Sequence, residues 1–302
     1  MVRIGVDFGG TKIEAAALDD SGGFLARLRA PNPGHYDAAI RTVCELVAAV
    51  ESAAGVRGTV GVGAPGSLSP RSGVIRNSNS TYLNGRRFHD DLSQALGRPI
   101  RTANDANCLA LSEALDGAAS GAGSVFAAIL GTGCGGGIVV DGRLLEGANG
   151  LGGEWGHVPL PWPDFDELQV APCWCGQRGC LETWISGTGF ERDHAASVAA
   201  AGAAALPLRA PQIVVAARAG DATAVASLDR YLDRLARALA MIVNLVDPEV
   251  FVFGGGMSNL PELYEQLAPR MRDRIFADAW EARLVAARWG DSSGVRGAAR
   301  LW

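Results

Sequence analysis

Three features that would place this chain in another class of protein are missing from its sequence. No apolar stretch approaches the roughly 20 residues that a membrane-spanning helix needs. Residues 1–7 enter a strand pattern directly, without the apolar core of a secretory signal peptide. Acidic residues outnumber basic ones by 32 to 27, whereas a nucleic-acid partner favours a basic face. We therefore expect a cytoplasmic protein that binds neither a membrane nor nucleic acid.

The composition that is present is ordinary for a folded protein. Hydrophobic residues make up 48% of the 302 residues and charged residues 20%. This length exceeds what one hydrophobic core usually serves, so two domains are expected. Apolar positions recur at helical spacing over residues 37–54 and 221–244, which predicts a helix in each segment.

Six cysteines are present, and three of them are clustered. Cys173, Cys175 and Cys180 fall within eight residues, and His157 is the only histidine close upstream of them. A Cys₃His set is a common closed, structural zinc site. The alternative is a disulfide, which a reducing cytosol disfavours, or three unrelated thiols, although clustered cysteines in that compartment more often bind a metal. The remaining cysteines lie in apolar or glycine-rich contexts and are expected to be buried free thiols: Cys44, Cys108 and Cys134.

Two carboxylates lie beside these expected metal ligands. Glu154 precedes His157 by three residues, and Glu182 follows Cys180 by two. A histidine that binds a metal through one ring nitrogen keeps the other free to donate a hydrogen bond. Glu154, His157 and Glu182 would then be presented together, and such a set suits a polyhydroxylated ligand. The alternative is that each carboxylate is a solvated loop residue.

Two glycine-rich turns, each between two predicted strands, are candidate phosphate sites. Glycines let backbone N–H groups approach an anion closely, threonine adds a hydroxyl, and lysine adds a cation. The first turn is neither a Walker A loop nor a dinucleotide fingerprint, and alone it would be explained by hairpin geometry. The same plan recurs in both halves of the chain, however, and two such turns facing one another would hold a polyphosphate. The candidate residues are Asp7, Gly9, Gly10, Thr11 and Lys12 in the first turn and Gly131, Thr132 and Gly133 in the second.

A carboxylate follows the predicted strand at residues 100–103. Asp105 lies directly before a predicted helix, so it could simply be the N-cap of that helix. Ligands of α/β proteins bind at the carboxyl ends of strands, however, and Asp105 is therefore also a candidate general base.

Two further segments have a functional and a plain interpretation. Gly254, Gly255 and Gly256 follow a predicted strand and would let an adenine or ribose lie against the backbone; otherwise they form a tight strand-to-helix turn. The polar loop at residues 73–85, which contains Asn79, is either ordinary surface or a donor of hydrogen bonds to sugar hydroxyls.

Six motifs of this chain occur together in one protein family. They are Asp7-x-Gly-Gly-Thr-Lys12, Asn104-Asp105, Gly131-Thr-Gly133, Glu154-x-x-His157, Cys173-x-Cys-Gly-x-x-Gly-Cys-x-Glu182 and Gly254-Gly-Gly256. This combination resembles the ROK family of sugar kinases and repressors over nearly the whole chain, and the cysteine-glycine motif is its most specific part. Segments 77–81, 154–162 and 290–299 most resemble proteobacterial fructokinases, also called manno(fructo)kinases.

The resemblance implies an α/β fold of the two-domain, actin-like ATPase (ribonuclease H-like) type, with a cleft between the domains. The implied domains are residues 1–116 plus 292–302, and residues 117–291. The implied cofactors are ATP with Mg²⁺ and a structural Zn²⁺, and the implied assembly is a homodimer.

The resemblance also implies a role for each candidate residue. Asp105 would be the base, and no role is assigned to Cys134. The implied sugar contacts are Gly66, Asn79, Asn104, Glu154, His157 and Glu182. The implied nucleotide contacts are Asp7, Gly9, Gly10, Thr11, Lys12, Gly131, Thr132, Gly133, Gly254, Gly255 and Gly256. The implied zinc ligands are His157, Cys173, Cys175 and Cys180.

The activity implied is phosphorylation of a hexose at its 6-hydroxyl by ATP, with D-fructose as the expected sugar and mannose as a further one. An alternative keeps the same site and changes the sugar to glucose or an N-acetylhexosamine, because the hydroxyl contacts are shared. A third interpretation, a sugar-responsive repressor, needs a helix-turn-helix before the first strand, and only three residues precede Ile4.

Overall fold

The computed structural model describes residues 2–168, 171–202 and 206–302, and these form two compact units. Unit 1 comprises residues 1–127, 137–153 and 287–302, and unit 2 comprises residues 128–136 and 154–286. This division differs from the expected boundary after residue 116, because residues 117–127 and 137–153 cluster with unit 1. Gly137 shows why: a Cβ there would lie 2.7 Å from the carbonyl oxygen of Ala106, so this strand packs closely on a helix of unit 1.

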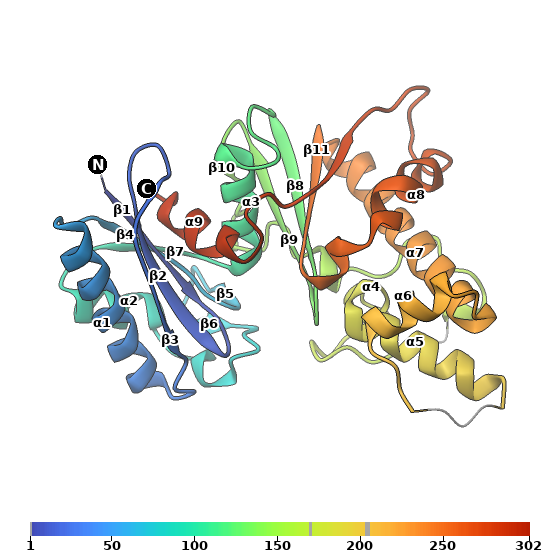
Figure 1. Ribbon diagram of the computed structural model, residues 1–302, viewed down its shortest axis with the longest axis horizontal. Coiled ribbons are helices and arrows are strands. Elements are labelled where there is room, and N and C mark those ends of the chain that lie inside the picture. The colour runs from blue at the N-terminus through green and yellow to red at the C-terminus, as the bar shows by residue number, and fades with distance from the viewer. Residues whose placement is uncertain (1, 169–170, 203–205) are drawn as a thin grey trace. The chain divides into compact units, whose positions relative to one another are not determined.

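Unit 1 contains a five-stranded mixed sheet in the order β3-β2-β1-β4-β7 (Figure 1). Strand β1 pairs antiparallel with β2 and parallel with β4, and β4 pairs parallel with β7. The strands are β1 Arg3–Phe8, β2 Lys12–Leu18, β3 Phe24–Pro31, β4 Thr59–Gly63 and β7 Ile100–Ala103. A small hairpin is formed by β5 Ser67–Leu68 and β6 Ile75–Arg76.

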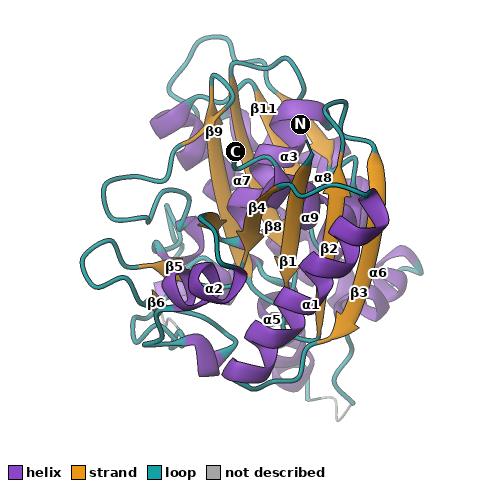
Figure 2. Ribbon diagram, turned by 90° about the vertical axis from the view of Figure 1, so that its left-hand side faces the viewer, coloured by secondary structure: helices purple, strands orange, loops and turns teal. Residues whose placement is uncertain are grey.

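Helices cover both faces of this sheet (Figure 2). On one face Ile4, Val6 and Phe8 of β1 join the core beneath α1, whereas Ala16 and Leu18 of β2 pack against α9. The approach of α9 is so close that a Cβ on Gly5 would lie 1.8 Å from the carbonyl oxygen of Val295, so this position requires glycine. The helices of unit 1 are α1 Tyr36–Ala54, α2 Phe88–Leu96, α3 Asp105–Asp116 and α9 Ser293–Ala299.

The second sheet has the strand order β10-β9-β8-β11-β12, and strands β8 and β9 carry residues of both units. Its strands are β8 Ser124–Leu130, β9 Cys134–Val140, β10 Arg143–Leu144, β11 Val250–Gly254 and β12 Arg283–Ala286. The helices of unit 2 are α4 Glu182–Ile185, α5 Gly187–Ala200, α6 Ala210–Arg218, α7 Ala222–Val246 and α8 Pro261–Arg272. None of the helices in the described part of the chain is both long and apolar enough to cross a membrane.

The predicted helices at 37–54 and 221–244 are confirmed as α1 and α7. The N-cap of helix α7 is Asp221, whose side chain accepts a hydrogen bond from the backbone N–H of Ala224, and Asp is a favoured N-cap residue. Its predicted apolar stripe is buried, from Leu228 through Val243. The stripe therefore serves core packing, as the periodicity predicts.

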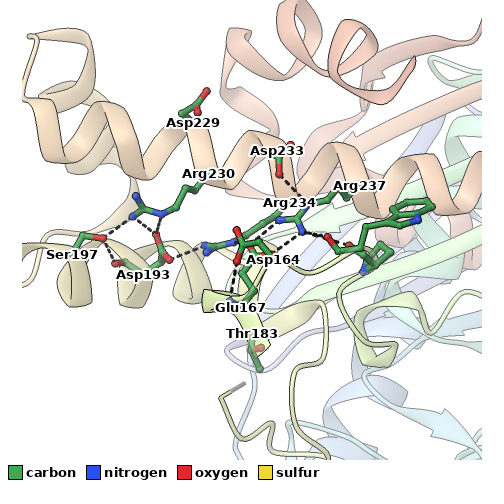
Figure 3. Close-up of polar contacts among 12 residues, drawn as sticks. Asp164, Glu167, Thr183, Asp193, Ser197, Asp229, Arg230, Asp233, Arg234 and Arg237 are labelled. Carbon is green, nitrogen blue, oxygen red and sulfur yellow. Dashed lines mark hydrogen bonds and ion pairs between the residues drawn. The ribbon is translucent and has the colours of Figure 1, made fainter. Parts of the chain in front are cut away.

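Buried ion pairs attach the loop that follows the His157 segment to helix α7 (Figure 3). Glu167 accepts hydrogen bonds from Arg234 and Arg237 at 2.7 Å, and Arg237 also donates to the carbonyl oxygen of Trp162 at 2.8 Å. Burial raises the pKa of Glu167, but the bonds from Arg237 and Arg234 outweigh it and lower the pKa to about 2. The loop is thus held by an ionised, fully paired carboxylate at neutral pH.

Candidate active site

The first glycine-rich turn joins β1 to β2 in unit 1. Its shape is fixed by Asn32, whose side-chain amide donates to the carbonyl oxygen of Gly9 at 2.7 Å and whose backbone N–H donates to Thr11 at 2.9 Å. Gly10 is exposed, and a Cβ there would meet only the hydroxyl of Ser80, at 3.8 Å. The space over the turn is therefore open to a ligand.

Asp7, at the end of β1, has a perturbed carboxyl group. Burial, and to a smaller extent the negative charge of Asp105, raise the pKa of Asp7 to about 6. Lys12 acts in the opposite direction and also forms a 3.8 Å ion pair with Asp291. The two carboxylates of Asp7 and Asp105 create an electronegative position next to the first glycine-rich turn, which suits a magnesium-bearing ligand.

Asp105 is the first residue of α3 and is not its N-cap. The N-cap is Asn104, whose side chain accepts the backbone N–H of Asn107 at 2.7 Å. The plain interpretation of Asp105 as a helix cap is therefore wrong. Burial of the carboxyl group raises the pKa of Asp105, and a general base accepts a proton only in its ionised form.

Two of the expected sugar contacts of unit 1 line one pocket, and the third does not. Gly66 and Asn104 are part of the wall of a 220 Å³ pocket. Gly66 has φ +90°, and a Cβ there would lie 2.5 Å from the carbonyl oxygen of Arg76, so only glycine fits. Asn79 is exposed and is not part of this wall.

The second glycine-rich turn, between β8 and β9, belongs to unit 2 and is attached to the start of α5. Gly187 donates its backbone N–H to the carbonyl oxygen of Gly131 at 2.7 Å, and the hydroxyl of Thr188 donates to the backbone carbonyl oxygen of Thr132 at 2.8 Å. These partners cannot be predicted from the sequence, because glycine and threonine at a helix start are common.

This turn borders a pocket of unit 2 with a volume of 590 Å³. Gly131, Thr132 and Gly256 line it, whereas Gly254 and Gly255 do not. Gly255 instead serves the tight turn, since it has φ +81° and a Cβ there would lie 2.5 Å from the carbonyl oxygen of Leu130. The wall residues that sequence reasoning missed are Gly187, Thr188, Glu191, Arg209, Ala210, Pro211, Val214, Val215, Arg218, Met257, Asn259 and Leu260.

The expected metal ligands are brought together in unit 2. The ligand atoms of His157, Cys173, Cys175 and Cys180 all lie within 4.8 Å of one another. The sulfurs of Cys175 and Cys180 are 3.7 Å apart, as are the sulfur of Cys173 and Nδ1 of His157. Two thiolates bound to one tetrahedral zinc at about 2.3 Å would be separated by about 3.8 Å, so the four residues fit that ion. The six cysteines are free thiols, and the disulfide alternative is therefore wrong.

The carboxylates beside this cluster lie at the second glycine-rich turn and in the loop that packs on it. Glu182 accepts the backbone N–H of Cys134 at 3.0 Å. Glu154 begins the short 3₁₀ turn Trp155–His157, and Trp155 donates its indole N–H to the carbonyl oxygen of Gly135 at 2.9 Å. The loop and the turn are therefore one packed assembly within unit 2. The remaining expected sugar contacts belong to unit 1, and a joint role for the two sets stays a prediction.

The chain belongs to the ROK family, whose model matches residues 3–302. It is 40% identical over 304 residues to an N-acetyl-D-glucosamine kinase of Pectobacterium atrosepticum, covering 98% of this chain and 97% of that protein. Among solved structures it resembles a ROK hexokinase from Thermus thermophilus, with a TM-score of 0.86, 35% identity and coverage of 99% and 97% of the two chains. It also resembles a ROK glucokinase from Streptomyces griseus in complex with glucose and AMPPNP, with a TM-score of 0.79, 29% identity and coverage of 100% and 99%.

These likenesses confirm the family and the two-domain α/β, actin-like ATPase fold that the motifs imply. They do not support D-fructose as the preferred sugar, because the relative of highest identity given above is named for N-acetyl-D-glucosamine.

Proposed function

We propose that this protein is an ATP-dependent kinase that phosphorylates the 6-hydroxyl of a hexose, and that N-acetyl-D-glucosamine is its preferred sugar. The observation that carries the kinase assignment is the 590 Å³ pocket of unit 2, which is bordered by Gly131 and Thr132 of a phosphate-type turn and by Gly256. Its volume lies in the range of about 300–1,000 Å³ that is usual for whole-ligand pockets, so a nucleoside fits with its phosphates at the turn. The choice of sugar is supported by the 40% identity to an N-acetyl-D-glucosamine kinase over nearly the whole chain.

The chemistry proposed for the site is in-line phosphoryl transfer. Asp105 accepts the proton of the sugar hydroxyl while its oxygen attacks the γ-phosphorus, and the bond from that phosphorus to ADP breaks. Phosphoryl transfer depends chiefly on positioning and charge neutralisation. The backbone N–H groups of Gly10 and Gly133 would supply positioning, and Lys12 a positive charge. Mg²⁺ bound to the ATP phosphates neutralises the charge that develops on them.

The zinc proposed for the Cys₃His cluster has a structural role. His157, Cys173, Cys175 and Cys180 would complete four-coordination, and a closed site of this kind leaves no position for a substrate. Because Nδ1 of His157 is the nitrogen next to Cys173, its Nε2 stays available for a sugar hydroxyl. The ion would therefore fix the loop that presents Glu154 and His157. We further propose that the enzyme is a cytoplasmic homodimer, which light scattering on the purified protein will test.

A coupled ADP-release assay tests the function directly. N-acetyl-D-glucosamine, D-glucose, D-mannose and D-fructose are compared at equal concentration with Mg-ATP, and phosphorus NMR locates the phosphate on the product. We expect the highest kcat/KM with N-acetyl-D-glucosamine and a phosphate at O6. A higher kcat/KM with D-fructose would return the assignment to a fructokinase, and no ADP release with any of the four sugars would refute the kinase proposal.

A further inference from the structure

Asn107 is a buried amide with an unsatisfied oxygen, two residues after Asp105 on α3. Its side chain is 6% exposed, and its Oδ1 has no hydrogen-bond partner among the described residues. Its backbone N–H, in contrast, donates a hydrogen bond to the side-chain oxygen of Asn104. Buried polar atoms are paired in the great majority of cases, so an orphan amide oxygen next to a catalytic carboxylate calls for an explanation.

The same residue lines the 220 Å³ pocket of unit 1 together with Gly66 and Asn104. This volume is below the roughly 300–1,000 Å³ of a pocket that encloses a whole ligand, so the pocket suits one substituent of a larger molecule. Part of its wall is apolar, formed by Leu68, Ile75 and Phe88. The substituent must therefore carry both an amide-pairing group and an apolar end.

We propose that this pocket is the subsite for the N-acyl group of an amino sugar, and that Asn107 is the residue that selects it. The inference rests on the proposed function and names the part of the site that reads the sugar. An acetamido group offers an N–H donor, a carbonyl acceptor and a methyl group. A carboxamide side chain pairs with such an amide in either orientation of its own oxygen and nitrogen. The methyl group would pack against Leu68, Ile75 and Phe88.

A hydroxyl at the same sugar carbon meets neither requirement. It is too short to fill the pocket, so the amide of Asn107 and the apolar wall would keep the same surroundings that they have without sugar. A site built to hydrogen-bond one group discriminates strongly against a ligand that lacks it, because its buried polar atoms are left unpaired. N-acetyl-D-glucosamine and D-glucose, which differ only in this substituent, are therefore the matched pair of substrates.

The test compares kcat/KM for these two sugars in three variants. Asn107→Ala should lose at least about tenfold with N-acetyl-D-glucosamine and change less than about twofold with D-glucose. Ala148→Leu narrows the same pocket while Asn107 itself stays unsubstituted, and it should show the same selective loss. Ser112→Ala is the control, since Ser112 is a fully buried residue of α3 whose hydroxyl also lacks a partner but does not line the pocket. It should leave the ratio of the two sugars unchanged.

Each outcome decides the inference. Equal losses on both sugars in Asn107→Ala and Ala148→Leu would overturn it and give Asn107 a structural role. A wild-type enzyme that uses both sugars equally well would also overturn it, while leaving the kinase assignment intact. Absence of any kinase activity would refute the proposed function instead. Calorimetric binding of the two sugars to wild type and to Ala148→Leu would then still test the subsite, and Ala148→Leu serves equally if Asn107→Ala does not fold.

Discussion

The indole N–H of Trp174 donates a hydrogen bond of 2.5 Å to Oε1 of Glu182. Trp174 lies between two of the expected zinc ligands, and its ring meets that of His157 edge-on at a centroid distance of 5.0 Å. The other oxygen of Glu182 accepts the backbone N–H of Cys134, at the end of the second glycine-rich turn. One carboxylate therefore joins the cysteine loop to that turn.

Trp174→Phe should raise the KM for the sugar several-fold while changing kcat less. Phenylalanine keeps the ring contact with His157 but cannot donate to Glu182, so the carboxylate loses one of its two orienting bonds, and a hydrogen bond to a charged group contributes about 1.5–3 kcal/mol. Steady-state kinetics with both substrates varied will separate the two constants. Trp162→Phe is the matched control, because Trp162 is 50% exposed and Trp174 59%. A Trp174→Phe enzyme with an unchanged KM would contradict this role.

Asp105→Asn should fold and lose turnover by about 10²–10⁴-fold, which is the usual contribution of a general base. The helix should not be affected, because Asn104 provides the N-cap of α3. Thermal melting and kcat are the two measurements. Asp37→Asn, also an exposed acidic residue in the first turn of a helix, is the control and should retain full turnover. Near-wild-type turnover in Asp105→Asn would remove the base assignment.

The raised pKa of Asp7 predicts how stability changes with pH. Its pKa is about 6 in the folded protein and 3.8 ordinarily, so between these values the folded state binds a proton that the unfolded state does not. Ionised Asp7 therefore costs up to about 3 kcal/mol at pH 7, and this cost disappears as the pH falls from about 7 to 4. Asp7→Asn should be more stable than wild type at pH 8 and should lose that advantage near pH 4.

Denaturant unfolding of the two proteins at pH 8, 6 and 4 will measure this difference. Asp37→Asn, which also removes one carboxylate, again serves as the control. If the difference between Asp7→Asn and wild type is the same at all three pH values, the Asp7 carboxyl does not titrate in the predicted window.

Features that depend on residues close together in the sequence are predicted correctly. The predicted bounds of α1 and α7 agree with the structure to within two residues at each end, because an apolar stripe of helical period has few other interpretations. The cysteine cluster was also predicted, since its ligands are close in sequence and of unusual residue types. The fourth ligand, His157, lies outside the cysteine motif, but it is the only histidine close upstream of it.

The pocket walls could not be predicted in the same way. The 590 Å³ pocket takes its wall from segments around residues 131, 187, 210, 215 and 257, which are far apart in sequence. Their residues, such as Val214 and Pro211, are of common types that carry no chemical signal. The orphan oxygen of Asn107 was equally hidden, because only the folded structure shows that an amide lacks a partner. Both the pocket wall and the missing partner of Asn107 depend on residues that are distant in the sequence and adjacent only in the folded structure.

The two glycine-rich turns should respond differently to the same substitution. A Cβ on Gly10 meets only the hydroxyl of Ser80, at 3.8 Å, whereas a Cβ on Gly133 would lie 2.7 Å from Oε2 of Glu182. Gly10→Val should therefore raise the KM for ATP and leave the KM for the sugar unchanged, because a side chain there pushes the phosphates off the backbone donors. Gly133→Val should raise both constants, since it also displaces Glu182. Equal effects on both substrates in a Gly10→Val enzyme that melts as wild type does would contradict the phosphate assignment.

Metal removal tests the role assigned to the cysteine cluster. Purified, reduced protein should contain about one zinc per chain, since thiolate ligands select zinc whereas Mg²⁺ prefers oxygen. Cys175→Ser should lose the zinc, and its affinity for the sugar should fall because Glu182 and His157 lose the loop that fixes them. The pocket proposed for ATP is formed by other segments, so nucleotide binding should stay within about twofold of wild type. Metal analysis and calorimetric titration with each ligand will measure these effects.

The control for this variant is Cys44→Ser, which replaces a half-buried thiol of α1 that is not part of the cluster. It should retain its zinc and its affinity for both ligands. A Cys175→Ser protein that has lost zinc yet binds the sugar as wild type does would show that the ion does not hold the sugar contacts. Protein that contains no zinc when freshly purified under reducing conditions would remove the metal from the proposal altogether, and the four ligand atoms within 4.8 Å would then need another explanation.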